Sequence, residues 1–517
     1  MDTSVIVVGA GPAGLMLAGE LRLAGVDVIV LERLSRPSGE SRGLGFSART
    51  MEVFDQRGLL PEFGDVEVSV LGHFGGTPVD FSVLDGAHYG VKGIAQARTE
   101  AVLGSWAVGL GADLRRGHEV LGFADRGGHV EVEVRDAGGA RSSLNAGYLV
   151  GCDGGRSTVR KAGGFDFPGT APTREMFLAD IRGGDIVPRP IGQSVPGGMI
   201  MSAPLGDGVD RIVVCERGRP PRRRGGPPDF SEVAGAWQRL SGQDISRATP
   251  VWISAFGDPA RQVTEYRRGR VLLAGDAAHV HLPAGGQGMN TSIQDSVNLG
   301  WKLAACVKGT GSPALLDSYH DERHPVGVRL LMNVQAQGLL FLSGDEMQPL
   351  REVMTELIGY DVVARHLAGM VSGLEIRYDV GDGDHPLLGR RMPPLEMVRD
   401  TGRTRPAELL RSGRGVLLDL ADGGGLRRLT DGWRDRVDLV AVHVPRAAAG
   451  SVLSGTRAVL IRPDGHVAWT DPGTESSLPA ALERWFGADS GWPHVRSAHL
   501  QPSTTHETYD TYERTSP

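Results

Sequence analysis

A glycine-rich turn near the N-terminus contains the residue types needed to bind a pyrophosphate. Residues 9–14 follow the pattern Gly-x-Gly-x-x-Gly, and an acidic residue, Glu32, lies 18 positions after the last glycine. In such a turn the glycines permit a tight bend, close approach of the backbone to the pyrophosphate, and close packing of helix on strand. The N-terminus of the following helix would direct free N–H groups at the phosphates, and Glu32 could accept hydrogen bonds from a ribose. The predicted dinucleotide contacts are Gly9, Gly11, Pro12, Ala13, Gly14 and Glu32.

Two further acidic turns favour FAD as the dinucleotide. Asp153 lies in Gly-Cys-Asp-Gly-Gly-Arg-Ser, and Asp276 lies in Gly-Asp-Ala-Ala-His; each follows a strand-like run. A carboxylate at the end of a strand can hydrogen-bond a polyol, and FAD contains one in its ribityl chain, whereas NAD has none. The glycine-rich stretch after Asp276 could pack against a flat ring, with the next helix directing N–H groups at the flavin N1–C2=O edge. The expected contacts there are Pro283, Gly286, Gly288, Met289 and Asn290.

The elements that would position these residues alternate between strand and helix. A buried strand at 4–8, a helix at 12–24 and a strand at 27–31 make one βαβ unit. Two more buried strands, ending at 151 and 275, precede the acidic turns. A helix over 288–307 places Met289, Ile293, Val297 and Trp301 on one face.

The remaining segments differ in character. Residues 176–270 contain strand-like runs typical of an antiparallel layer, 315–380 is rich in helix, and strands recur from 415 to 469. We predict an α/β fold with a Rossmann-like FAD-binding domain and an inserted β-rich substrate domain. The expected division is FAD-binding domain 1–175 and 270–383, with 71–95 contributing to the substrate side; substrate domain 176–269; C-terminal domain 384–487; disordered tail 488–517.

Composition excludes several classes of function. The 517 residues include 55 Lys and Arg against 62 Asp and Glu, and the net charge of −7 argues against nucleic acid as the main partner. Three cysteines without a C-x-x-C pair argue against a disulfide scaffold, a zinc ribbon and a dithiol site.

The absence of a long apolar run and of a basic leader predicts no membrane contact and a cytoplasmic location. His279 and His281 could form a metal pair, but no further donor lies at a recognised spacing, so we expect no metal.

The three motifs, in this order, resemble those of the class A flavoprotein monooxygenases, the family of para-hydroxybenzoate hydroxylase. The similarity is greater to aromatic polyketide hydroxylases of the angucycline type, and it extends to about residue 487. The stretches that carry this resemblance are GESRGLGFSARTMEVFDQRG at 39–58, HLPAGGQGMNTSIQDSVNLGWKL at 281–303, HLAGMVSGLEI at 366–376 and HPLLGRR at 385–391.

The resemblance implies an FAD-dependent aromatic monooxygenase that uses NADPH as a transient co-substrate and O2. A flavin C4a-hydroperoxide would hydroxylate a polycyclic aromatic polyketide, at position 12 and/or 12b of an angucycline, in antibiotic biosynthesis. Its C-terminal domain would be thioredoxin-like and, lacking C-x-x-C, would serve packing or a homodimer contact. It also implies roles for Arg33 near the adenosine or pyrophosphate, Arg42 near the pyrophosphate and flavin, Gln96 and Asp276 on the ribityl chain, and Asp153 toward FAD and NADPH.

Substrate contacts and competing functions remain open at this point. Phe74, Phe81 and Met201 are candidates for the substrate pocket, although they could equally belong to the core. No catalytic side chain is assigned, since the flavin is the reactive group. The alternatives are another flavoenzyme of this fold, a reductase or halogenase, and a non-catalytic protein that keeps the dinucleotide fold. The sequence lacks the Trp-x-Trp pattern of flavin halogenases and keeps the whole loop 283–290 expected at the flavin.

Overall fold

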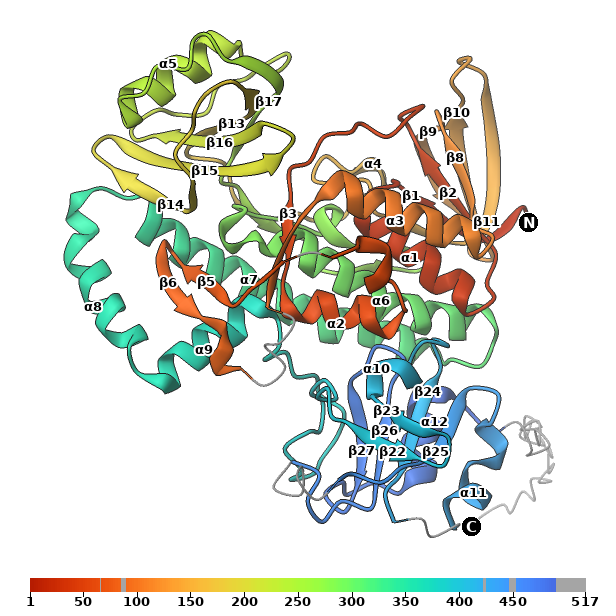
Figure 1. Cartoon of the computed structure of the whole chain (residues 1–517). Helices are drawn as coiled ribbons and strands as arrows, with labels where there is room; N and C mark the ends of the chain where they lie inside the picture. The colour runs from red at the N-terminus through yellow and green to blue at the C-terminus, as the bar shows by residue number, and fades with distance from the viewer. Residues whose placement is uncertain (66, 85–89, 422–424, 446–451, 490–517) are drawn as a thin grey trace, which may run out of the picture.

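The computed structural model describes residues 1–65, 67–84, 90–421, 425–445 and 452–489 (Figure 1). The predicted disordered tail falls almost wholly outside these described residues, which end at 489. Among the described residues, no helix is both long enough and apolar enough to cross a membrane.

A mixed eight-stranded sheet forms the first layer. Its main path runs β19-β20-β11-β1-β2-β8, in which the five strands from β20 to β8 are mutually parallel. The apolar runs predicted as buried strands account for this, because a parallel sheet is covered on both faces. The strands are β1 (Thr3–Val8), β2 (Val28–Glu32), β8 (Asp113–Arg116), β9 (Glu119–Asp125), β10 (Val130–Arg135), β11 (Arg141–Gly151), β19 (Arg267–Arg268) and β20 (Val271–Leu273).

Long helices pack beside this sheet and against one another. The helix α1 (Pro12–Leu23) lies between α3 (Gln96–Gly109) and α6 (Gln287–Val307), and α7 (Pro313–Leu342) packs on α6. The predicted helix at 288–307 is therefore present, but it is buried on nearly every side rather than along one apolar face. Its buried polar residues are held by partners from other elements, which the helical periodicity could not indicate.

The inserted segment forms a five-stranded antiparallel sheet, seen at the upper left of Figure 1 with α5 (Phe230–Ser241) on its outer face. Alternation divides its side chains between two faces. One face, including Ile200 and Ile212, packs under Trp237 of α5, and the other carries Met199 and Val213. The order is β14 (Arg189–Val195), β15 (Gly198–Gly206), β16 (Val209–Glu216), β13 (Glu175–Arg182), β17 (Thr249–Gly257).

Short elements connect these layers. The helix α2 (Ala48–Gln56) follows β3 and lies above the C-terminal domain, and the hairpin β5–β6 lies against α9. The remaining elements here are β3 (Leu44–Phe46), β4 (Val68–Ser69), β5 (Leu71–Phe74), β6 (Thr77–Asp80), β7 (Val91–Ala95), α4 (Thr158–Ala162), β12 (Gly169–Thr170), β18 (Ala260–Gln262), β21 (His279–Val280), α8 (Gln348–Ile358) and α9 (Asp361–Ser372).

The C-terminal segment has its own four-stranded mixed sheet, in the order β25-β24-β26-β27. The pair β24–β25 is parallel, and β24–β26 and β26–β27 are antiparallel. The predicted strands from 415 to 469 are present, and the thioredoxin-like assignment of this domain stays a prediction. The elements are β22 (Met397–Arg399), β23 (Gly402–Thr404), α10 (Pro406–Leu409), β24 (Gly415–Asp419), α11 (Gly425–Thr430), β25 (Val437–Ala441), β26 (Ala458–Ile461), β27 (Val467–Asp471) and α12 (Leu478–Phe486).

Candidate functional site

The structure brings the three predicted motifs together at one edge of the parallel sheet. Gly9 follows β1, Glu32 ends β2, Asp153 follows β11 and Gly275 follows β20. These four strands are neighbours and parallel, so their carboxyl ends meet on the same side, which is where open α/β sheets bind ligands.

Close backbone contacts explain why glycine is required at these turns. A Cβ on Gly14 would lie 1.9 Å from the Gly9 carbonyl oxygen, and a Cβ on Gly9 would lie 2.5 Å from the Cys152 carbonyl oxygen. A Cβ on Gly275 would contact Ala13 of α1 at 3.2 Å and Ser292 of α6 at 2.9 Å. The turn after each strand therefore packs directly on the next motif.

Two helices begin at this edge without a capping side chain. Gly11 precedes α1 and Gly286 precedes α6, and neither helix has an acidic residue in its first turn. A Cβ added to either glycine would meet nothing within 4 Å, so both helix ends face open space. Their unpaired N–H groups and positive dipole ends are suited to phosphate or to an electron-rich ring edge.

The carboxylates of the three motifs differ in how many hydrogen bonds they accept from the protein itself. Glu32 accepts hydrogen bonds from the backbone N–H groups of Ala10 and Leu34, both at 2.9 Å. The Oδ2 atom of Asp153 accepts from Thr158 N–H at 2.6 Å, but its Oδ1 atom is buried without a partner. Asp276 is exposed and makes no hydrogen bond within the described part of the chain. A buried carboxylate oxygen without a donor is costly, and ligand hydroxyl groups would remove that cost.

Segments distant in sequence meet at the start of α6. The Gln96 side chain accepts a hydrogen bond from Gly43 N–H at 3.2 Å, and a Cβ on Gly43 would lie 3.1 Å from the Met289 methyl group. Asn290 accepts from the Ser47 N–H at 2.9 Å and donates to the Gly286 carbonyl at 2.8 Å. Gln96, Met289 and Asn290, predicted separately, therefore lie in one neighbourhood.

A buried ion cluster supports the Asp276 turn and was not predicted. Asp295 of α6 lies 2.8 Å from His279 Nε2, accepts from Arg323 Nε at 2.7 Å, and accepts from Gly275 N–H at 3.2 Å. Burial raises the pKa of Asp295, but the positive charges of Arg323 and His279 lower it by more than burial raises it. The pKa of Asp295 therefore lies below its ordinary value. The paired carboxylate holds the turn that carries Asp276. Within the described residues no group of three His, Cys, Asp or Glu side chains could hold a metal.

The loop 283–290, which the sequence predicts at the flavin, is named the flavin-side loop below. A chain of buried amides, which was also not predicted, joins this loop to the β5–β6 hairpin. Asn333 donates to Gln287 at 2.9 Å, Gln337 donates to Asn333 at 3.0 Å, and Gln337 accepts from Gly75 N–H at 3.2 Å. Only helical spacing of Asn333 and Gln337 in α7 could have hinted at this, because their partners lie far away in sequence.

The inner face of the five-stranded sheet offers an apolar surface toward the same region. Half-buried Met201, Trp252 and Phe256 gather there with Leu282 and Phe341, next to the flavin-side loop. Phe74 and Phe81 are 6% and 2% exposed and pack in another cluster under α9. Of the three substrate candidates, Met201 alone is partly open, while the two phenylalanines occupy core positions.

The predicted Arg33 and Arg42 differ in their pairing from a basic cluster of five arginines in one loop: Arg217, Arg219, Arg222, Arg223 and Arg224. Arg33, directly after β2, and Arg42 are exposed, and their side chains make no hydrogen bond within the described residues. In the basic cluster around 217–224, by contrast, Arg224 forms ion pairs with Glu175 and Glu232. Arg224 is thus neutralised within the protein, whereas the side chains of Arg33 and Arg42 face solvent.

This donor set fits FAD. Uncapped helix N-termini match phosphate and the flavin pyrimidine edge, an unpaired buried carboxylate oxygen and an exposed aspartate match a polyol, and glycines leave space for a flat ring.

Comparisons with known proteins agree with this geometry. Residues 2–334 match a family described as FAD binding domain, and residues 385–489 match one described as aromatic-ring hydroxylase, C-terminal. A 12-dehydrotetracycline 5-monooxygenase/anhydrotetracycline 6-monooxygenase from Streptomyces rimosus subsp. rimosus is 43% identical over 94% of this chain and 99% of its own. The crystal structure of CabE, an aromatic hydroxylase from angucycline biosynthesis, is 69% identical with a TM-score of 0.92, covering 95% and 100% of the two chains. BexE, a protein studied for oxidation during BE-7585A biosynthesis, is 65% identical with a TM-score of 0.90, covering 94% and 100%.

Proposed function

This chain belongs to the FAD-binding aromatic-ring hydroxylases and is an FAD-dependent monooxygenase, and we propose that its substrate is a polycyclic aromatic polyketide of the angucycline type. Hydroxylation would occur at position 12 and/or 12b, in the biosynthesis of an antibiotic. The observation that carries this proposal is the assembled sheet edge with two uncapped helix ends beside an apolar sheet face. The high identity to CabE favours an angucycline over other polyketides.

We assign the cofactor contacts as follows. The turn at 9–14 would hold the pyrophosphate, Glu32 the adenosine ribose, and Arg33 and Arg42 the phosphates. Asp276 and Gln96 would hold the ribityl hydroxyls, with Asp153 alongside. The loop contacts at the flavin would be Pro283, Gly286, Gly288, Met289 and Asn290.

Bound FAD supplies the redox chemistry that reduces dioxygen and transfers one oxygen atom. The chain's own residues bind and orient the flavin and the substrate, and they keep water away from the reacting region. The inner face with Met201 and Trp252 would exclude water and hold the fused rings by apolar contact. No side chain is assigned as a base, because the phenol of the substrate is itself acidic enough to activate its ring.

Each part of the chain has a separate role in this proposal, and NADPH is a further partner. Residues 1–175 and 270–383 would bind FAD, 176–269 would bind the polyketide, and the thioredoxin-like 384–487 would pack on them or mediate a homodimer. NADPH would reduce the flavin transiently, in the cytoplasm, without a second dinucleotide fold.

Product identification tests the proposal. Purified protein is incubated with NADPH, a panel of tetracyclic phenols and 18O-labelled dioxygen, and the products are analysed by mass spectrometry. We expect a yellow protein, NADPH oxidation stimulated by an angucycline, and one labelled oxygen per hydroxylation. Stimulated NADPH oxidation without label in the product would overturn the hydroxylase assignment, and labelling of tetracycline precursors alone would overturn the angucycline assignment.

A further inference from the structure

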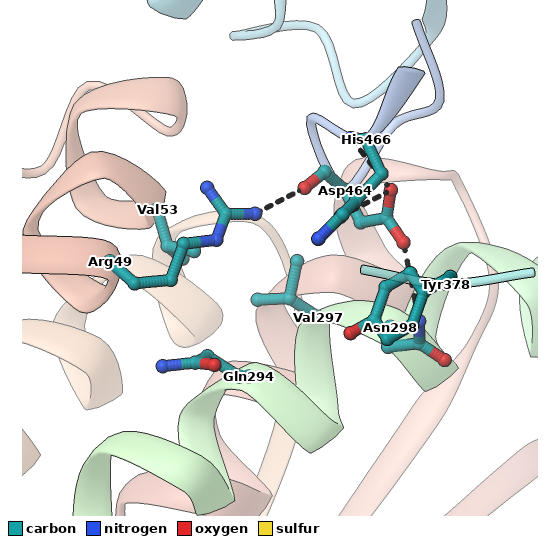
Figure 2. Close-up of a pocket in the computed structure, with 8 residues that line it drawn as sticks. All are labelled: Arg49, Val53, Gln294, Val297, Asn298, Tyr378, Asp464 and His466. Atoms are coloured by element: carbon teal, nitrogen blue, oxygen red, sulfur yellow. Dashed lines mark hydrogen bonds and ion pairs between the residues drawn. The ribbon is translucent and has the colours of Figure 1, made fainter. Parts of the chain in front are cut away.

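The C-terminal domain inserts a sharp turn, Pro463-Asp464-Gly465, against α2 of the FAD-binding region. Figure 2 shows this junction, where Asp464 and His466 meet Arg49 of α2 and Asn298 of α6 around a small cavity. Gly465 has φ 81°, and a Cβ there would lie 2.5 Å from the Gln56 side chain. The turn is therefore seated directly on α2.

Buried arginines at both ends of α2 bind this turn. Arg49 Nη2 donates to the Asp464 carbonyl at 2.6 Å, and Arg57 Nη2, just beyond the helix, donates to the Pro463 carbonyl at 2.9 Å. Between them, Glu52 accepts from Arg391 of the C-terminal segment at 2.6 Å. All four of these charged residues are at most 8% exposed. Charge-assisted hydrogen bonds in such a buried setting fix geometry strongly.

The N-terminal end of α2 is also attached to the first turn of α6. Ser47, the residue before α2, donates from its backbone N–H to Asn290 Oδ1 at 2.9 Å, and Asn290 in turn donates to Gly286. Ser47 and Arg49 are two residues apart, so a shift of the helix end that Arg49 holds also shifts Ser47.

We propose that Arg49 is a positioning residue, through which the turn 463–465 of the C-terminal domain sets the place of α2. By way of Ser47 and Asn290, the same turn sets the place of residues 286–290, which are the end of the flavin-side loop and the first turn of α6. The C-terminal domain thus contributes to flavin binding without touching the flavin. This inference rests on the assignment of Asn290 to the flavin edge, and it is independent of which polyketide is hydroxylated.

The primary test is a double-mutant cycle on FAD affinity, measured by fluorescence titration of the apoprotein. We expect Arg49→Met and Asn290→Ala each to weaken FAD binding, the first by roughly threefold to thirtyfold. The double variant should bind FAD about as weakly as Asn290→Ala alone, because both changes interrupt one path. The visible absorption band of bound flavin should shift in Arg49→Met, which a purely structural role would not cause.

A change made on the other side of the junction tests the same path. Gly465→Ala introduces a Cβ at φ 81°, where a side chain is strained, and 2.5 Å from the Gln56 amide, so the turn or the Gln56 side chain must shift while the whole FAD-binding region is unaltered in sequence. It should reproduce the loss of affinity and the band shift. If Arg49→Met does not yield folded protein, Arg49→Lys or Gly465→Ala takes its place in the double-mutant cycle with Asn290→Ala.

Arg436→Met serves as the matched control. Arg436 is also a largely buried cation, with a side chain 13% exposed, but it donates to the Phe486 carbonyl at 2.6 Å and the Gly432 carbonyl at 2.8 Å inside the C-terminal domain, and no described hydrogen bond joins it to α2 or to the turn 463–465. Its replacement should lower thermal stability while leaving FAD affinity and the flavin band unchanged. Equal effects of Arg436→Met and Arg49→Met, or additive effects in the cycle, would overturn the proposal. If Asn290→Ala itself leaves FAD affinity unchanged, the placement of the flavin edge is wrong instead.

Discussion

At the scale of single residues, glycines determine whether the motifs can meet. Gly14 has no room for a side chain, because its Cβ would overlap the Gly9 carbonyl oxygen. The requirement is steric and local, and so the Gly-x-Gly-x-x-Gly pattern could be recognised without a structure.

Gly14→Ala is expected to lower the free energy of unfolding by about 1–3 kcal/mol and to weaken FAD binding, because α1 must move away from β1. Urea unfolding and FAD titration would measure both effects. Gly104→Ala is the control, since Gly104 lies in α3 with only an ordinary contact at 3.8 Å and should be slightly stabilised. Equal behaviour of the two variants would contradict the packing argument.

Asp276→Ala should weaken FAD binding without loss of stability. The side chain is exposed and makes no hydrogen bond within the described residues, so its removal disturbs no contact of the protein itself. We expect an affinity loss of roughly 10- to 150-fold, as for one charge-assisted hydrogen bond, with an unchanged melting temperature. Asp400→Ala, another exposed aspartate, is the control and should change neither quantity. Unaltered affinity in Asp276→Ala would remove this residue from the ribityl site.

At the scale of elements, successive side chains of the five-stranded sheet alternate between two faces, and the two faces have different surroundings. The face under α5 is closed by Trp237, whereas the face with Met201 remains half-open toward the flavin-side loop. Strand pairing and period-2 alternation thus convert one apolar segment into a core face and a second apolar face, which we propose binds the substrate.

Met201→Trp is expected to raise KM for the polyketide several-fold while FAD affinity stays constant, because the larger ring occupies space on the binding face. Steady-state kinetics with an angucycline that the product analysis shows to be hydroxylated, together with FAD titration, would separate the two quantities. Val187→Trp, at a position that is 58% exposed, provides the control for a surface tryptophan. A changed FAD affinity with unchanged KM would place Met201 at the cofactor rather than the substrate.

At the scale of the whole molecule, a buried network of charges joins the C-terminal domain to the FAD-binding region. Glu322 of α7 binds Arg462 at 2.6 Å and Lys302 at 2.8 Å, and Asp464 accepts from Asn298 at 3.3 Å. His466 lies among these groups: burial lowers its pKa to about 4, and Asp464, Arg49, Arg462 and the Tyr378 ring face it.

Stability should therefore fall as the pH is lowered from about 6.5 toward 4. In that window His466 is protonated in the unfolded chain but not in the folded protein. The contribution of neutral His466 to the free energy of unfolding is therefore fully present only above the pKa of the unfolded chain. The loss has a slope of at most about 1.4 kcal/mol per pH unit for this group. The pKa of Glu322, lowered to about 2 chiefly by Arg462 and Lys302 against the effect of burial, adds a loss at lower pH in the same direction.

Urea unfolding of wild type and His466→Gln between pH 7.5 and 4.5 would measure this dependence. The variant cannot titrate at this position, so its profile should be flatter than that of wild type. Parallel profiles would show that acid destabilisation originates elsewhere.

The sequence by itself determined the local features of this protein. The Gly9–Gly14 turn, the acidic residues after their strands and the strand and helix periods depend on near neighbours, and the structure has these elements close to the predicted bounds. Family resemblance, carried by continuous stretches such as 281–303, was likewise readable from the chain.

Only the tertiary structure decided which distant side chains became partners. The Asp295–Arg323 pair, the Gln287–Asn333–Gln337 amides and the seating of 463–465 on α2 join segments up to 415 positions apart. It also placed Phe74 and Phe81 in a core while leaving Met201 half-open. Pattern and propensity act over a few residues, whereas burial of a charge or an aromatic ring depends on the packing of the entire chain, which determines both the cost of burial and the partners that offset it.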